Sequence, residues 1–193
     1  MNYCNIKKFD IANGEGIRTT LFVSGCRNRC KNCFQPETWS FDYGEPFTEA
    51  VENEILDTFK VPSVRGLTLL GGEPMEPENQ RALLPFLKRF KKEYPDRDLW
   101  LFTGNLYEEL TGACGQHPKY IEVTDEILSL VDILVDGRFV EEKKRLGLRF
   151  RGSENQRIID MNKTREKGTI VIWEGCKLDK HYAKEGVNYE AQN

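Results

Sequence analysis

Three cysteines stand close together in the sequence, at a spacing typical of metal ligands. They are Cys26, Cys30 and Cys33, separated by three and by two residues. Iron–sulfur clusters are held by cysteine thiolates, and short spacings let one loop wrap one cluster. Three ligands leave one iron of a four-iron cluster without a protein ligand, and catalytic metal sites commonly keep such a position open for substrate. The triplet therefore favours a [4Fe–4S] cluster with one open iron.

A structural zinc site is the main alternative for the same residues. Such sites take four protein ligands, and no fourth Cys or His lies near the triplet in sequence, although Cys4 can fold back to complete the set. The chain has only two histidines, His117 and His181, which excludes a His-rich site. Cys114 and Cys176 follow no pattern and are predicted to be ordinary thiols.

A Gly-Gly-Glu-Pro run forms a second candidate site. It comprises Gly71, Gly72, Glu73 and Pro74. Two glycines let the backbone approach a ligand closely, and exposed carbonyls there can accept hydrogen bonds from an ammonium group. The same run also fits a tight strand-to-helix turn, with Pro74 and Pro77 at the helix start. Taken alone, the run does not separate a ligand site from a turn.

Three further candidates stand at or just beyond predicted strand ends. Thr103 lies at the end of the third predicted strand, and Asp136 at the end of the fourth. An aspartate in this position can accept hydrogen bonds from ribose hydroxyls, but it can equally cap the next segment. Arg138 can bind a carboxylate, because the guanidinium group matches its fork geometry. We therefore predict Thr103, Asp136 and Arg138 as cofactor-binding residues.

Short apolar runs, most of them bounded by glycine, predict the strands that position these residues. The expected strands are 17–25, 64–71, 99–104, 131–137, 157–160 and 169–173. Apolar side chains at helical spacing predict helices at 48–59, 78–94 and 124–130. Because strand and helix alternate, the fold class is α/β with a mainly parallel sheet.

The number of strand–helix units limits the architecture. About six units fit, whereas a closed eight-unit barrel needs roughly 250 residues. We expect an open, partial β/α barrel, with a flat doubly wound sheet as the alternative. In both, sites lie at the carboxyl ends of strands. The length of 193 residues favours one domain over 1–193, and the polar segment 175–193 is predicted to be a loosely held tail.

Charge and hydropathy exclude several classes of partner. The net charge is −3, so nothing global points to nucleic acid or to an anionic membrane. The N-terminus does not resemble a signal peptide, and no run is apolar enough to span a bilayer, which predicts a cytoplasmic protein. Residues 138–151 carry six basic side chains against two acidic ones. This segment is either a solvated loop or a basic rim for an acidic or phosphate-bearing partner.

The cysteine triplet after one strand and Gly-Gly-Glu-Pro after the next resemble radical S-adenosylmethionine enzymes. Many members carry an aromatic residue before the third cysteine, where this sequence has Asn32, and Phe34 follows that cysteine instead. Residues 13–26, 135–139 and 151–160 are similar to segments of the anaerobic ribonucleoside-triphosphate reductase activating proteins. The extra cysteine clusters of some other glycyl-radical activases are missing from this sequence.

The resemblance implies an activity, two cofactors and two partners. The triplet would hold a [4Fe–4S] cluster that reductively cleaves S-adenosylmethionine, whose amino group would lie at Gly71, Gly72 and Glu73. The resulting 5′-deoxyadenosyl radical would generate the glycyl radical on the large subunit of the anaerobic reductase. An electron donor such as flavodoxin or ferredoxin is also implied. Activation of another glycyl-radical enzyme, such as pyruvate formate-lyase, and a non-catalytic zinc or iron–sulfur module stay open as alternatives.

Overall fold

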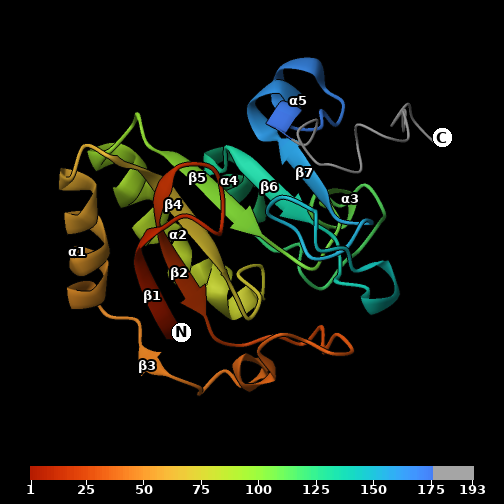
Figure 1. Cartoon of the computed structure of the whole chain (residues 1–193), viewed down its shortest axis with the longest axis horizontal. Coiled ribbons are helices and arrows are strands. Elements are labelled where there is room, and N and C mark those ends of the chain that lie inside the picture. Colours follow the sequence, from red (N-terminus) through yellow and green to blue (C-terminus); the bar gives the residue numbers. More distant parts are fainter. Residues whose placement is uncertain (176–193) are drawn as a thin grey trace.

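The computed structural model describes residues 1–175 of the chain. Within this part, a mixed sheet of seven strands has the spatial order β3-β1-β2-β4-β5-β6-β7 (Figure 1). The strands are β1 (Asn2–Asp10), β2 (Ile17–Val23), β3 (Glu45–Pro46), β4 (Val64–Gly71), β5 (Asp98–Phe102), β6 (Ile133–Asp136) and β7 (Arg157–Asp160). The helices are α1 (Glu49–Asp57), α2 (Pro77–Glu93), α3 (Tyr107–Leu110), α4 (Thr124–Leu130) and α5 (Met161–Lys167), with short 3-10 turns η1 (Pro36–Trp39), η2 (Thr58–Lys60) and η3 (Glu141–Lys143). Apart from Gly175, the predicted tail lies outside the described residues, as do Cys176 and His181.

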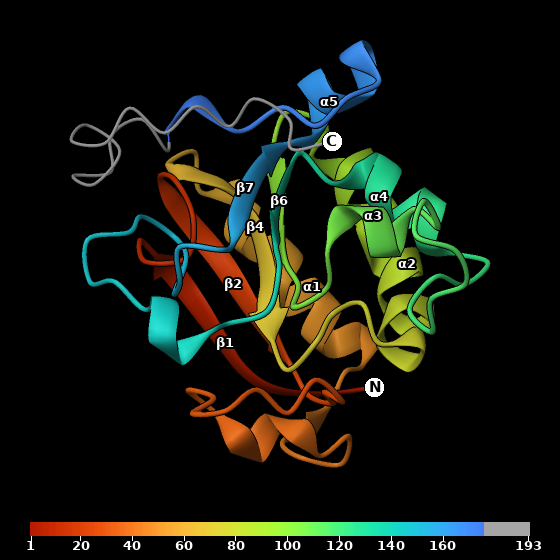
Figure 2. The same cartoon turned by 90° about the vertical axis from the view of Figure 1, so that its right-hand side faces the viewer.

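Strands β2, β4, β5 and β6 run parallel and stand side by side in chain order. Because this order does not reverse, right-handed connections place the intervening helices on one face of the sheet. Figure 2 shows α2, α3 and α4 on that face and the loop that follows β6 on the other. The order argues against the doubly wound alternative.

Antiparallel strands complete both edges of the sheet. β1 and β3 extend it beyond β2, and β7 extends it beyond β6. The terminal strands β3 and β7 do not pair with each other, so the sheet is not closed. The prediction of an open, mainly parallel α/β sheet is confirmed. Its parallel part has four strands rather than about six units, because the edges are antiparallel.

Several element boundaries match the sequence prediction, and two elements differ from it. The ranges of β4, α4 and β7 coincide with the predicted ones. β1 was not predicted, because its residues are mostly polar and none of them is fully buried. The predicted strand at 169–173 is wrong: only Ile172 forms an isolated bridge, to Ile159. Its apolar residues serve packing instead, since the ring of Trp173 lies 5.2 Å from that of Trp100.

Side chains are buried on both faces of the parallel strands, which explains the nearly continuous apolar runs in the sequence. On the helical face, Leu67, Leu69 and Leu101 belong to one core cluster with Leu83 and Leu87 of α2. A smaller cluster covers the opposite face and consists of Trp100, Ile133, Val135 and Ile158, with Phe102, Phe150, Ile172 and Trp173 packed against it.

A buried arginine fills the sheet's second face near the amino ends of the parallel strands. Arg18 is fully buried and forms an ion pair with Asp98. Its Nε donates to Thr68 Oγ1 at 2.7 Å, and its guanidinium lies 5.3 Å from the ring of Trp100. This end of the sheet is therefore packed by the protein itself. No helix among residues 1–175 is long and apolar enough to span a membrane.

Candidate iron–sulfur and cofactor site

The predicted site residues gather at the carboxyl edge of the sheet. Because the four central strands are parallel, the segments that follow them meet at one edge. The cysteine triplet follows β2, and the Gly-Gly-Glu-Pro turn follows β4. Thr103 follows β5, and Asp136 ends β6 with Arg138 two residues beyond. The topology thus brings together residues that are more than a hundred positions apart in the chain.

The cysteine loop, residues 24–35, curls before its second and third cysteines. Arg29 and Asn32 both adopt left-handed backbone conformations, with φ of 45° and 55°. Each stands directly before a cysteine, and Cys33 N donates to Cys30 O at 3.1 Å. All three cysteines of the triplet are free thiols; Cys26 is buried, and the other two are half-buried. Left-handed residues reverse the chain locally, so this loop can wrap a compact group.

The thiol environments connect the loop to two other strand ends. Burial raises the pKa of the Cys26 thiol to about 11, and the nearby Glu73 carboxylate adds to this shift. Burial also raises the pKa of Cys30, while Arg138 and the backbone N–H of Phe139 act in the opposite direction. Cys26 therefore lies beside the turn after β4, and Cys30 beside the segment after β6.

The donor set of the triplet fits an iron–sulfur cluster. Three free thiols on one loop are the ligand type that such clusters use. Within residues 1–175, no three His, Cys, Asp or Glu side chains already lie at metal-binding spacing. Strand β1 also brings Cys4 to this region, where its Sγ lies 3.6 Å from Nε2 of Gln35, two residues after Cys33. Cys4, the residue on which the zinc alternative depends, therefore lies near the end of the cysteine loop.

The Glu73 carboxylate is buried and accepts five hydrogen bonds from the described residues. Oε1 accepts from Met75 N at 2.9 Å and from Thr103 Oγ1 at 2.8 Å. Oε2 accepts from Asn28 Nδ2 and Gly104 N, both at 2.8 Å, and from the third donor, Asn105 Nδ2, at 3.0 Å. Burial raises the pKa of Glu73, and several of these donors oppose the shift. The carboxylate thus ties its own turn to the cysteine loop and to the end of β5.

The two glycines before Glu73 are required by the protein's own packing. A Cβ on Gly71 would approach Val23 N to 2.7 Å, and its φ of +112° is unfavourable for other residues. A Cβ on Gly72 would lie 2.7 Å from the carbonyl oxygen of Gly25 and 3.0 Å from that of Thr38. These glycines therefore allow neighbouring backbone to come close, as in a tight turn, and their predicted contact with a ligand stays a prediction.

Thr103 and Asp136 are also engaged by protein partners. The Thr103 hydroxyl donates to Glu73 and is nearly buried. Asp136 is fully buried, pairs with Arg157 and accepts from Tyr107 N at 2.8 Å. Burial raises the pKa of Asp136, and Arg157 opposes the shift. Asp136 is thus held by β7 and by the first residue of α3, and its predicted contact with ribose stays a prediction.

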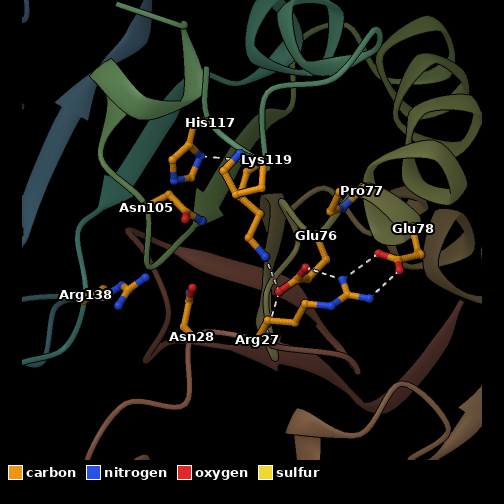
Figure 3. A pocket seen from close by; sticks show the side chains of 10 residues that line it. Arg27, Asn28, Glu76, Pro77, Glu78, Asn105, His117, Lys119 and Arg138 are labelled. Atoms are coloured by element: carbon orange, nitrogen blue, oxygen red, sulfur yellow. Dashed lines mark hydrogen bonds and ion pairs between the residues drawn. The ribbon is translucent and has the colours of Figure 1, made fainter. Parts of the chain in front are cut away.

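Arg138 borders a pocket of about 450 Å³ at the same edge. Figure 3 shows the Arg138 side chain directed toward Asn28, with Asn105 and His117 above them. The pocket is lined by Arg27, Asn28, Glu76, Pro77, Glu78, Asn105, His117, Pro118, Lys119 and Arg138. Pockets of this volume accommodate small-molecule cofactors.

Four polar residues that build this site were not predicted from the sequence: Asn28, Glu76, Asn105 and Lys119. Asn28 and Asn105 donate to Glu73, and Glu76 forms ion pairs with Lys119 and with Arg27. Asn28 could have been found, since it lies between two cysteines of the triplet. The pairing of Glu76 with Lys119 spans 43 positions and depends on the tertiary fold.

Comparisons with known proteins agree with this geometry. A family model described as a 4Fe-4S single cluster domain matches residues 12–159, so the fold and the cysteine loop define an iron–sulfur protein of that class. The anaerobic ribonucleoside-triphosphate reductase-activating protein of Pasteurella multocida is 45% identical over 158 residues, which cover 81% of this chain and 95% of that protein. The proteins of the same name from Escherichia coli K12 and from Enterobacteria phage T4 are 38% and 33% identical, with 96% and 93% of their lengths covered.

The chain belongs to the family of anaerobic ribonucleoside-triphosphate reductase-activating proteins. The predicted resemblance is thereby confirmed, and the four-iron cluster domain agrees with the ligand chemistry of the triplet.

The raised pKa of Cys26 predicts how this thiol reacts in the cluster-free protein. Only the thiolate is nucleophilic, and its fraction grows about tenfold per pH unit below the pKa. Alkylation of Cys26 by iodoacetamide should therefore be slow at neutral pH and accelerate until the pH reaches about 11. Peptide mass spectrometry at a series of pH values measures this, with the exposed Cys114 as internal reference. Equal rates for Cys26 and Cys114 at neutral pH would contradict the buried environment.

Proposed function

We propose that this chain activates an anaerobic ribonucleoside-triphosphate reductase by generating a glycyl radical on its large subunit. The observation that carries the proposal is the position of the triplet: three free thiols on one curled loop, directly after β2, at the open carboxyl edge of the sheet. The names of the relatives and their nearly complete coverage support it.

In this proposal Cys26, Cys30 and Cys33 hold the [4Fe–4S] cluster. When bound and reduced, the cluster would supply the electron for cleavage of S-adenosylmethionine into methionine and a 5′-deoxyadenosyl radical, and that radical would take a hydrogen atom from the reductase glycine. The chain itself orients the reactants and excludes water. Since Cys26 is buried and Cys30 lies beside Phe139, the loop is packed on two sides before any ligand binds.

S-adenosylmethionine is proposed to occupy the pocket next to the cysteine loop. Arg138 reaches this pocket, and its guanidinium suits the methionyl carboxylate. The Glu73 carboxylate already accepts five hydrogen bonds. We therefore assign the methionyl amino group to a backbone carbonyl of the Gly-Gly-Glu-Pro turn. The Gly72 carbonyl suits this role, because it accepts no hydrogen bond from the residues that the structure describes.

Two partners are needed for the complete reaction. One is the reductase, and the other is a one-electron donor such as flavodoxin or ferredoxin, which must approach the cluster loop. Phe34, next to Cys33, is 98% exposed, and Leu146 in the loop after β6 is 99% exposed. Lys31 in the cysteine loop contacts Glu142 at 3.4 Å, so the two segments are neighbours. They form a rim around the site that is open to a partner.

A zinc-binding module is the second candidate, and the approach of Cys4 to the cysteine loop favours it. Iron and sulfide analysis after anaerobic reconstitution separates the two. The zinc alternative requires Cys4 as a ligand and gives no deoxyadenosine. Activation of another glycyl-radical enzyme would share all the cofactor chemistry and differ only in the protein that acquires the radical.

Removing one ligand of the triplet tests the cluster assignment. Cys30→Ala should reduce deoxyadenosine formation to the level of a cluster-free sample, because three thiolates leave no spare ligand. Cys114→Ala should retain full iron, sulfide and activity, since that exposed thiol lies outside the loop. Deoxyadenosine is measured by chromatography after dithionite reduction with S-adenosylmethionine. Full cluster content and activity in Cys30→Ala would contradict the assignment.

The basic segment 138–151 predicts that association with the reductase depends on charge. Arg138 borders the pocket, Arg145 pairs with Glu154, and Arg149 stacks on Phe150. Lys143 and Lys144 are exposed, and neither forms an ion pair within residues 1–175.

Reversing Lys143 and Lys144 to Glu should lower the initial rate of glycyl-radical formation, because surface charges mainly tune encounter. Deoxyadenosine formation without reductase should persist. A matched reversal of Lys92 and Lys167, exposed at the ends of α2 and α5, should change neither rate. Equal rates for both double variants would show that 138–151 is a solvated loop. Loss of deoxyadenosine formation in the first variant would show that the segment shapes the cofactor site.

A further inference from the structure

Glu76 occupies an unusual position for a carboxylate. It is the N-cap residue of α2, where an acidic side chain ordinarily accepts a hydrogen bond from the first turn of its own helix. Here the side chain forms no such capping bond. It is fully buried and turned toward the cysteine loop instead, as Figure 3 shows. The carboxylate therefore has a task outside its own helix.

The carboxylate binds the residue that follows the first cysteine. Its Oε1 accepts from the backbone N–H of Arg27 at 2.7 Å, and its Oε2 accepts from Arg27 Nη1 at 2.7 Å. The guanidinium of Arg27 also lies 4.3 Å from the ring of Phe41, and the preceding N–H, of Cys26, donates to Trp39 O at 3.2 Å. The backbone is thus fixed on both sides of the Cys26–Arg27 peptide.

A second cation makes the burial of this carboxylate possible. Lys119, with 7% of its side chain exposed, forms an ion pair with Glu76. Burying a charge is costly unless it is paired, and a buried ion pair contributes little net stability compared with apolar side chains. The Glu76–Lys119 ion pair therefore adds little to the free energy of folding, while the same carboxylate binds the backbone N–H of Arg27. These two facts favour a role of Glu76 in positioning the cysteine loop.

Glu78 provides a natural contrast on the same arginine. Its carboxylate accepts from Arg27 Nη1 and Nη2 at 2.9 and 2.6 Å, but half of its side chain is exposed. It does not contact the Arg27 backbone. Arg27 lowers the pKa of Glu78 to about 2, so this carboxylate is charged at neutral pH. Glu78 thus binds the same guanidinium as Glu76 but makes no hydrogen bond to the loop backbone.

We propose that Glu76 is a positioning residue, whose buried carboxylate anchors the cysteine loop through the Arg27 N–H and holds Cys26 in place for cluster binding. This rests on the proposed function, because it concerns the ligand loop of the same site. Glu76 also borders the pocket proposed for S-adenosylmethionine, but this role does not depend on a contact with the cofactor. It acts through the backbone next to a ligand.

Two measurements on the same variants test the anchor. The first is amide hydrogen exchange over residues 26–33 in the cluster-free protein. The second is the rate at which the reconstituted protein releases iron to a chelator. Losing a hydrogen bond to a charged group should accelerate both by about tenfold in Glu76→Ala. Glu76→Gln keeps an acceptor for the N–H and should be intermediate. Glu78→Ala should behave as wild type in both.

A second variant separates anchoring from general destabilisation. Glu76→Ala leaves Lys119 buried without its partner, which by itself lowers stability. Glu76→Ala combined with Lys119→Met removes this cation and should recover thermal stability. The anchor account predicts that exchange and iron release stay fast in this double variant. Recovery of slow iron release together with thermal stability would overturn it, since a stability effect alone would then explain the single variant.

The remaining outcomes are equally decisive. Identical behaviour of Glu76→Ala and Glu78→Ala in both measurements would overturn the anchor. Faster exchange with unchanged iron release would overturn its role toward the cluster. A wild-type chain that takes up no four-iron cluster would overturn the proposed function, and hydrogen exchange would still decide whether Glu76 anchors the loop.

Discussion

The buried carboxylate of Glu73 joins the segments on which the site depends. One of its oxygens reaches the cysteine loop through Asn28, and both reach the end of β5 through Thr103, Gly104 and Asn105. A buried polar group is costly when unpaired and rigid when every partner is present. Because Asn28 of the cysteine loop donates to this carboxylate, the loop cannot shift without breaking a hydrogen bond to the segment that follows β4. The position of the ligand loop is therefore a property of the sheet.

The rest of the fold covers both faces of the sheet and leaves its carboxyl edge accessible. Arg18 fills the second face near the amino ends of the parallel strands, and Trp100, Phe150 and Trp173 pack on the same face. The helices cover the other face. What stays accessible is the carboxyl edge, where the thiols, the pocket and the exposed Phe34 lie. An open sheet of this kind suits a reaction whose second substrate is a glycine within another protein.

Much of this arrangement could be predicted from the sequence, because it depends on local pattern. The run 64–71 is apolar and ends at glycine, so it predicts β4 and places the Gly-Gly-Glu-Pro turn directly after it. The cysteine spacing predicts the ligand type without knowledge of the fold. Strand β1 could not be predicted in this way, since a strand of partly exposed and mostly polar residues shows no clear alternation.

The roles of individual polar side chains were harder to predict, because they depend on partners far away in sequence. Thr103, Asp136 and Glu73 stand where ligand contacts were expected, yet their polar atoms bind other residues of the chain. The pattern gave their location at the carboxyl edge correctly. It could not show that Asn28 of the cysteine loop donates to Glu73, or that Arg157 on β7 pairs with Asp136. These side chains thus support the site through contacts within the chain, and their predicted contacts with a cofactor stay predictions.

The central claim is that this chain produces a radical on a reductase, and electron paramagnetic resonance tests it most directly. The anaerobic reductase is incubated with the reconstituted chain, S-adenosylmethionine and a reductant, and then frozen. The account predicts a glycyl-radical doublet that is absent when S-adenosylmethionine or the chain is omitted. A reduced cluster that forms deoxyadenosine but leaves the reductase without this signal would contradict the account and direct the search to another radical acceptor.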